Sequence, residues 1–160
     1  MKQELFNDDW LFWYDENSFA LVWNIPEQAQ KVTLPHDAMI SETPYAESRN
    51  GNNTGFRDGK NYVYVKTFIA EEEDLYRENI LKFEGSYMNT FVYVNGQLAG
   101  KHHNGYTTFY VNMKDFLHFG ENEIRVQVRN GAMSNSRWYS GGGLYRDVYL
   151  LSSDLLHVSA

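Results

Sequence analysis

Apolar and polar residues alternate with a period of two in several short segments of the chain. The alternation recurs at 62–68, 80–83 and 124–128, and turn-forming residues separate these segments. Because successive side chains of a β-strand point to opposite faces, this period predicts strands that bury one face in a core. Several short strands separated by turns are typical of a sandwich. The pattern therefore predicts an all-β fold.

The clearest local signal is a hairpin at 91–100. Residues 91–94 favour a strand, Asn95-Gly96 follows, and residues 97–100 return. Asn-Gly supplies the positive φ angles that a two-residue type I′ turn requires. Helical periodicity is scarce, and a short turn near 113–117 is its best candidate. We expect helices to be few and short.

The N-terminal third of the chain differs from the rest in how its aromatic and polar residues are distributed. The segment 10–14 contains four aromatic residues, a polar stretch follows, and an apolar segment returns at 32–37. Aromatic rings left in water forfeit the free energy of burial. This region is therefore expected to supply an opening strand and an arm that lies on the sandwich.

Composition narrows the class of protein. The 160 residues suffice for one domain, so residues 1–160 are expected to form a single globular unit. The net charge of -7, with no basic block, argues against nucleic acid as a partner. The chain has no cysteine, no apolar run that could span a membrane and no signal-peptide pattern. A cytoplasmic location without a membrane partner is expected.

Most candidate chemistry in the chain has an ordinary structural interpretation. The run 71–74 reads as a solvated loop, and His36 with Asp37 reads as a buried pair that pins the arm rather than as a catalytic dyad. His102 and His103 are adjacent, so on a strand they point to opposite faces and cannot easily share a metal. We expect no metal site and no cofactor.

A loop near the C-terminal end is the strongest candidate for binding. Residues 136–150 carry three consecutive glycines, at 141–143, preceded by Arg137, Trp138 and Tyr139. Aromatic faces beside a guanidinium suit a sugar, and glycines allow turns that side chains forbid. The alternative is structural: the two rings cap the sandwich and Arg137 pairs with a nearby acid.

Several short motifs follow one another along almost the whole chain. They lie at 7–12, 34–37, 64–68, 81–85, 92–100, 103–109, 120–130 and 137–150. In this order they resemble the N-terminal sugar-binding domain of glycoside hydrolase family 2, a family that includes β-galactosidases, β-glucuronidases and β-mannosidases. Each segment by itself is weak evidence for the family, but the complete series in this order is specific to it.

The resemblance implies a jelly-roll β-sandwich, similar to galactose-binding domains, at the start of a larger multidomain enzyme. An immunoglobulin-like domain and a TIM barrel would follow, the barrel would carry both catalytic glutamates, and the enzyme would be a homo-oligomer. No acid of this chain matches the catalytic signature, so no catalytic residue is expected here. Loops at the barrel mouth would bind the substrate, which implies Arg137, Trp138, Tyr139, Asn52 and Asp58 as substrate-binding residues.

The function that the resemblance implies is carbohydrate binding within a retaining exo-β-glycosidase, with β-galactosidase as the first choice. The substrate would be a β-glycoside, and the excised domain would be inert. Two alternatives stay open. The chain could be a free-standing carbohydrate-binding module, or a structural interaction domain that makes no contact with sugar.

Overall fold

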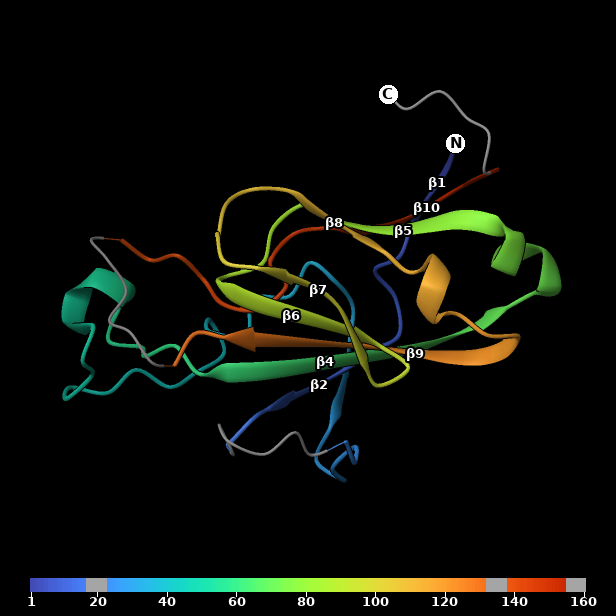
Figure 1. Ribbon diagram of the computed structural model, residues 1–160. Helices are drawn as coiled ribbons and strands as arrows, with labels where there is room; N and C mark the ends of the chain where they lie inside the picture. Colours follow the sequence, from blue (N-terminus) through green and yellow to red (C-terminus); the bar gives the residue numbers. More distant parts are fainter. Residues whose placement is uncertain (17–22, 132–137, 155–160) are drawn as a thin grey trace.

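The computed structural model describes residues 1–16, 23–131 and 138–154, which form two antiparallel β-sheets facing each other (Figure 1). The strands of the four-stranded sheet are, in spatial order, β1 (Lys2–Leu5), β10 (Val148–Asp154), β5 (Arg77–Phe83) and β8 (Phe109–Asn112). Those of the six-stranded sheet are β3 (Gln30–Val32), β2 (Trp10–Tyr14), β4 (Asn61–Ala70), β9 (Gly120–Arg129), β6 (Asn89–Val94) and β7 (Gln97–His102). The chain crosses repeatedly between the sheets, as in a jelly-roll sandwich, which confirms the predicted fold class.

The three strands that alternation predicts are all present. Residues 62–68 lie in β4, 80–83 in β5 and 124–128 in β9. The strands β4 and β9 pair along their whole length, from Asn61 opposite Arg129 to Ala70 opposite Gly120. This ladder forms the centre of the six-stranded sheet.

The predicted hairpin is confirmed as β6 and β7. Asn95 and Gly96 connect the two strands with φ angles of 48° and 80°, the positive values that a type I′ turn requires. The Asn95 side chain also bonds outside the turn, because its Nδ2 donates to the carbonyl of Phe116 at 2.8 Å. The hairpin is thereby tied to the 3₁₀ helix η3 (Lys114–Phe116), the short turn expected near this position.

The main core lies between the two sheets. Trp10 and Tyr64 of the six-stranded sheet and Leu81 and Phe83 of the four-stranded sheet are fully buried there. Phe83 stacks on Phe109 of the neighbouring strand β8 with 4.7 Å between ring centroids. Alternate positions of each strand therefore supply the core, as the period of two requires.

The N-terminal region contributes both the expected strand and the expected arm. Strand β2 joins the six-stranded sheet, and Trp23 packs against Tyr93 and Arg125 of that sheet. There the Arg125 guanidinium lies 5.6 Å from the ring centroid of Trp13 and 5.0 Å from that of Trp23. Arg125 also donates a hydrogen bond to the Trp23 carbonyl at 2.6 Å. A buried cation between two indole rings thus fastens the arm.

Two elements of the structure do not follow from the sequence pattern. The acidic run 71–74 belongs to a 3₁₀ helix, η2 (Glu72–Tyr76), whose first turn is closed by a capping box between Glu71 and Asp74. Strand β1 has no alternating pattern, and all of its side chains are exposed. Hydrogen bonding to β10 defines it as an edge strand. None of the helices in the described parts of the chain is long and apolar enough to cross a membrane.

The ends of the sandwich differ in their connections. Helix η1 (Gly51–Thr54) lies at one end, at the left of Figure 1, and η2 and η3 lie at the opposite end, at the right. The loop 138–143 and the connection from β7 to β8 run at the left end. The two ends therefore present different surfaces.

Close backbone approach explains the three consecutive glycines. A Cβ on Gly143 would lie 2.1 Å from the Tyr64 hydroxyl, and one on Gly142 would lie 2.9 Å from the Tyr62 hydroxyl. Both tyrosines come from β4 and are fully buried, so neither can move aside freely. Gly143 also has a φ angle of +81°, which favours glycine.

We predict that Gly143→Ala destabilises the domain more than Gly96→Ala does. Both glycines have φ near +80°, so both variants lose about 1 kcal/mol to a left-handed backbone. Only Gly143 faces a close neighbour, because a Cβ on Gly96 meets nothing within 4 Å. Overpacking should add roughly 1–3 kcal/mol at Gly143. Urea unfolding of both variants measures the difference, and equal losses would contradict the packing argument.

Candidate functional site

Two segments lie side by side at the left end of the sandwich: residues 36–38 of the N-terminal arm, and residues 138–144, which we call the glycine segment. The amide of His36 donates to the carbonyl of Leu144 at 2.8 Å, and the amide of Ala38 donates to the carbonyl of Gly142 at 2.9 Å. On the other side, Gly143 and Tyr87 exchange two backbone hydrogen bonds. Residues 142–144 are therefore held between two other segments of backbone.

Asp37 joins the same two segments through its side chain. One carboxylate oxygen, Oδ1, accepts hydrogen bonds from the amides of Met39 and Gly142, each at 3.0 Å. The other oxygen, Oδ2, accepts the hydroxyl proton of Tyr139 at 2.6 Å. Burial, and then the bond to Asp37, raise the pKa of Tyr139. The hydroxyl therefore stays protonated and keeps donating.

His36 bonds elsewhere. Its Nδ1 is hydrogen-bonded to the Tyr64 hydroxyl at 2.9 Å, and its ring lies 4.6 Å from that of Phe12. Burial lowers the pKa of His36, although the neighbouring Asp37 opposes this effect. The imidazole is thus a neutral, half-buried group. His36 and Asp37 pin the arm through different partners, and their geometry is not that of a catalytic dyad.

Three exposed aromatic rings gather at this end: Tyr106, Trp138 and Tyr139, which we call the aromatic ledge. Trp138 is 58% exposed and Tyr139 39% exposed. The indole Nε1 of Trp138 donates to the Tyr106 hydroxyl at 3.1 Å, which joins the glycine segment to the connection between β7 and β8. Exposed rings with hydroxyl and carboxylate groups beside them suit a ligand that has both apolar faces and hydroxyls.

The other residues that the sequence assigns to binding lie in different situations. Arg137 lies outside the described residues. Asn52 belongs to η1 and is exposed. Asp58 is buried and bonded to its own loop. The structure therefore brings Trp138 into contact with Tyr106, which the sequence did not single out as a binding residue, while Tyr139 bonds Asp37.

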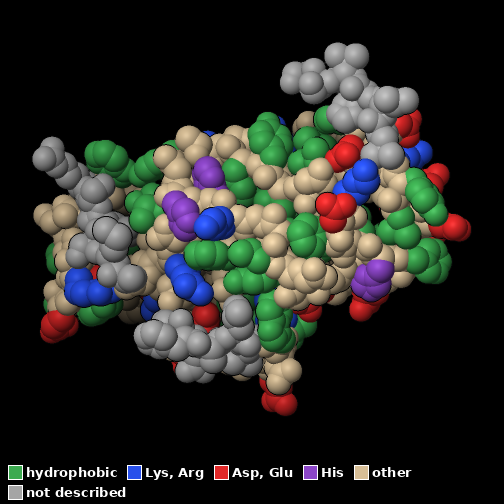
Figure 2. All heavy atoms as spheres, viewed as in Figure 1, with side chains coloured by type: hydrophobic (Ala, Val, Ile, Leu, Met, Phe, Trp, Pro, Cys, Tyr) green, Lys and Arg blue, Asp and Glu red, His purple; other side chains and the backbone are tan. Residues whose placement is uncertain are grey.

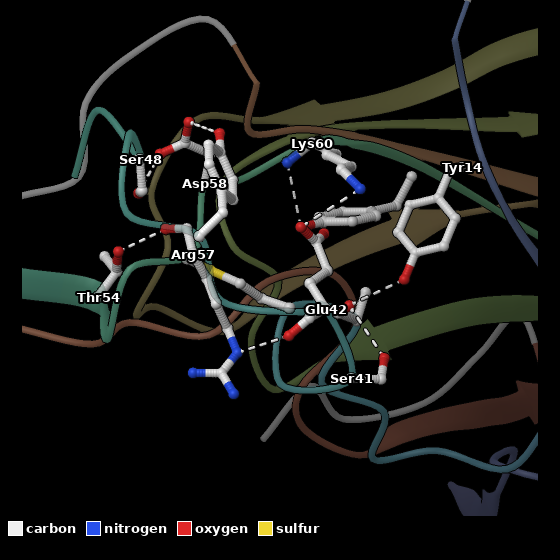
Figure 3. A network of polar contacts seen from close by, with 12 residues as sticks. Tyr14, Ser41, Glu42, Ser48, Thr54, Arg57, Asp58 and Lys60 are labelled. Carbon is white, nitrogen blue, oxygen red and sulfur yellow. Dashed lines mark hydrogen bonds and ion pairs between the residues drawn. The ribbon is translucent and has the colours of Figure 1, made fainter. Parts of the chain in front are cut away.

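Asp58 organises the loop 45–58. Its carboxylate accepts hydrogen bonds from the hydroxyls of Tyr45 and Ser48 and from the amide of Asn50, at 2.5, 2.7 and 3.2 Å (Figure 3). Burial raises the pKa of Asp58, but these hydrogen bonds outweigh it and lower the pKa to about 2. Both oxygens are occupied by loop donors. Whether Asp58 also meets a sugar stays a prediction from the sequence.

Glu42 is a buried acid that sequence reasoning missed. Its side chain is only 7% exposed, and its Oε2 lies 3.4 Å from the Lys60 ammonium (Figure 3). Within the described chain, its Oε1 has no hydrogen-bond partner. Burial raises the pKa of Glu42, and Lys60 partly offsets the increase. No local pattern marks this residue, because its burial arises only when the arm folds over β4.

A shallow apolar hollow of about 280 Å³ lies beside the loop 45–58. It is lined by Pro44, Tyr45, Ala46 and Phe56. The Tyr45 hydroxyl that bonds Asp58 holds one wall of the hollow in place. The left end therefore presents a second apolar surface besides the aromatic ledge.

No group of three or more His, Asp or Glu side chains among residues 1–16, 23–131 and 138–154 could hold a metal ion. His102 stacks on Phe109 at 4.4 Å, whereas His103 lies 5.8 Å from Phe91 on the other side of the sheet. The two histidines thus point to opposite faces, as the sequence predicts.

The sequence matches the model of glycosyl hydrolases family 2, sugar binding domain, over residues 45–154. The match covers more than half of the chain, and it includes η1, the connection from β7 to β8 and the glycine segment. The chain therefore belongs to this family, and the class of protein is a sugar-binding β-sandwich domain.

Individual relatives agree with this assignment. The β-galactosidase BoGH2A of Bacteroides ovatus is 34% identical over 155 residues, which cover 96% of this chain and 18% of that protein. A β-glucuronidase of Bacteroides fragilis is 27% identical, over 94% of this chain and 20% of that protein. The crystal structure of a β-glycosidase from Bacteroides vulgatus has a TM-score of 0.87 and 32% identity, over 96% of this chain and 20% of that one. The chain spans about a fifth of the length of these glycosidases.

We predict that Asp58→Asn destabilises the domain above pH 4 but has little effect near pH 2. A carboxylate whose pKa is about 2 in the folded state and 3.8 ordinarily stabilises the fold at pH values above 3.8. That contribution disappears as the pH falls through the folded pKa. The loss at pH 7 should be about 1–3 kcal/mol.

Urea unfolding of both proteins at several pH values measures this effect. Asp154→Asn is the control, because the Asp154 side chain is 82% exposed and its ion pair with Arg77 lies at the surface. A difference between wild type and Asp58→Asn that stays constant from pH 7 to pH 2 would contradict the prediction.

Proposed function

We propose that this chain is the N-terminal carbohydrate-binding domain of a retaining exo-β-glycosidase, a β-galactosidase, and that the aromatic ledge helps to form the subsite for the non-reducing sugar. The observation that carries the proposal is the ledge itself. Three rings from two connections lie at one end of a family 2 sandwich, and hydrogen bonds from neighbouring backbone and from Asp37 hold the backbone of residues 142–144 beside them. The similarity to BoGH2A supports the choice of a galactoside.

The ledge suits a sugar for a chemical reason. The C–H groups on one face of a pyranose ring are apolar and pack on an aromatic face, while the hydroxyls around its edge need polar partners. Trp138 and Tyr139 offer ring surface, and the exposed Asn52 amide could bond a hydroxyl. Arg137, the residue before Trp138, would add a donor.

Within the proposed enzyme the domain positions the substrate and supplies no reacting group. A retaining glycosidase uses two carboxylates, one as nucleophile and one as acid and then base. Asp37 and Asp58 are occupied by backbone and hydroxyl donors, and Glu42 is buried beside Lys60. The proposal places both catalytic carboxylates in a downstream TIM barrel, so the domain contributes orientation and binding energy.

A β-glucuronide is the second candidate substrate, because cationic side chains gather around Phe91 on the six-stranded sheet. Lys101, His103 and Arg129 lie around Phe91, with the Arg129 guanidinium 4.8 Å from its ring centroid. Figure 2 shows basic and histidine side chains together over this part of the six-stranded sheet. In the described chain neither Lys101 nor Arg129 has an ion-pair partner within 4.0 Å. Unneutralised cations would favour a carboxylate-bearing sugar.

We predict that the full-length protein encoded by the native reading frame hydrolyses a chromogenic β-galactoside faster than the matching β-glucuronide or β-mannoside, and that the 160-residue chain hydrolyses none. Comparing kcat/KM across the three substrates measures this. If the β-glucuronide is cleaved fastest, the proposed substrate becomes a β-glucuronide rather than a β-galactoside. If the full-length protein cleaves none of the three substrates, the proposed glycosidase activity is wrong. A free-standing carbohydrate-binding module would then be the remaining hypothesis.

We predict that Trp138→Ala in the full-length protein raises KM roughly tenfold, because an aromatic face contributes about 1 kcal/mol or more to ring contacts. The matched control is Tyr76→Ala, which removes a 68% exposed ring from η2 at the opposite end of the sandwich and should leave KM unchanged. If both variants keep the wild-type kcat and KM, the ledge does not bind substrate and the domain has only a structural role.

A further inference from the structure

Asp37 is the point at which the arm meets the aromatic ledge. Its Oδ1 accepts two backbone amides, one from its own segment at Met39 and one from the glycine segment at Gly142. Its Oδ2 accepts the Tyr139 hydroxyl at 2.6 Å. A carboxylate is well suited to this position because it accepts several hydrogen bonds and donates none.

These bonds restrict the Tyr139 ring. A tyrosine side chain turns about two bonds, and here its Cα is held by the chain while its hydroxyl is held by Asp37. The ring therefore has one favoured direction although it is 39% exposed. Trp138 is fixed separately, through the hydroxyl of Tyr106. The two rings of the loop thus depend on two different anchors.

Asp37 also restricts the backbone under the rings. Gly141 has a φ angle of +75°, and a Cβ there would lie 3.2 Å from the Asp37 carboxylate. The carboxylate therefore rests against Gly141 and bonds the next amide, at Gly142. Removing it would free a backbone segment in which three consecutive glycines impose little stiffness.

We propose that Asp37 is a positioning residue for the sugar subsite, which holds the Tyr139 ring and the Gly141–Gly142 backbone in the arrangement that meets the substrate. We assign Asp37 a positioning role rather than a contact with the sugar, because three donors of the chain already bond its two oxygens. The inference rests on the proposed function of the ledge. It assigns the orientation of the Tyr139 ring, one of the three rings of the ledge, to an acid on the arm.

The chain provides a matched control in Asp147. Its Oδ1 accepts a hydrogen bond from Asn7 Nδ2 at 2.8 Å, and its Oδ2 accepts the Tyr149 hydroxyl at 3.3 Å. Asp147 thus also joins an N-terminal segment to a C-terminal one through an amide and a tyrosine. Tyr149, however, lies beside Lys82 on the outer face of the four-stranded sheet and does not belong to the ledge.

The test compares Asp37→Ala, Asp37→Asn and Asp147→Ala in the full-length protein, with the best chromogenic glycoside as probe. Asp37→Ala should raise KM roughly tenfold with kcat nearly unchanged, because it weakens binding in both ground and transition states. Asp37→Asn should raise KM by about threefold or less, because its oxygen still accepts the amides and its nitrogen can donate to the Tyr139 oxygen.

Asp147→Ala should lower the urea midpoint by an amount similar to Asp37→Ala and leave KM unchanged. An equal rise of KM in both alanine variants would overturn the proposal, because Asp37 would then act only through general stability. Asp37→Asn supplies a folded variant if Asp37→Ala fails to fold, and Tyr139→Phe supplies another that keeps the ring and removes only its bond to Asp37.

A second readout does not depend on activity. Amide hydrogen exchange in peptides covering 138–142 should accelerate in Asp37→Ala and stay at the wild-type rate in Asp147→Ala. Unchanged exchange in Asp37→Ala would refute the positioning role whether or not any glycoside is cleaved. If exchange accelerates while the wild-type protein cleaves nothing, the positioning role stands and the proposed glycosidase fails. If Trp138→Ala raises KM and Asp37→Ala does not, the proposed binding role of the ledge stands and the positioning role of Asp37 fails.

Discussion

The arrangement of this domain depends on the contact between the arm and the glycine segment. Backbone bonds from His36 and Ala38 run along residues 142–144, and the Asp37 carboxylate closes the contact from the side. More than a hundred residues separate the two segments in the chain. Without this contact the aromatic ledge would stand on a flexible run of glycines. A carboxylate that bonds three donors therefore makes a flexible sequence into a defined surface.

The core takes part in the same contact. Tyr62 and Tyr64 are buried residues of β4, yet their hydroxyls reach the places where Gly142 and Gly143 leave no room for a side chain. A phenol combines a large apolar ring with one polar end. The rings thus fill the sandwich, while the hydroxyls mark where the loop must approach. Core packing and loop position are set by the same side chains.

At the left end of the sandwich, the acidic side chains that are bonded within the domain are distinct from the groups that are exposed to solvent. Glu42 and Asp58 lie beneath the surface and Asp37 is partly exposed, and hydrogen bonds or Lys60 balance the charges of all three. The exposed groups include the rings of the ledge, the Asn52 amide and charged side chains such as Arg49. This arrangement is consistent with the proposed role of the domain in binding and orientation rather than in bond cleavage.

The sequence by itself determined the sandwich, the hairpin at Asn95-Gly96 and the main strands, because periodicity and turn chemistry are local properties. Strand β1 and the burial of Glu42 have no such signal, since each depends on a distant partner. Only the tertiary structure decided that Asp58 bonds its own loop and that Tyr106 joins Trp138. Tyr106 and Trp138 lie 32 positions apart in the chain. Even within the loop 45–58, no local pattern encodes which hydroxyl will meet which carboxylate.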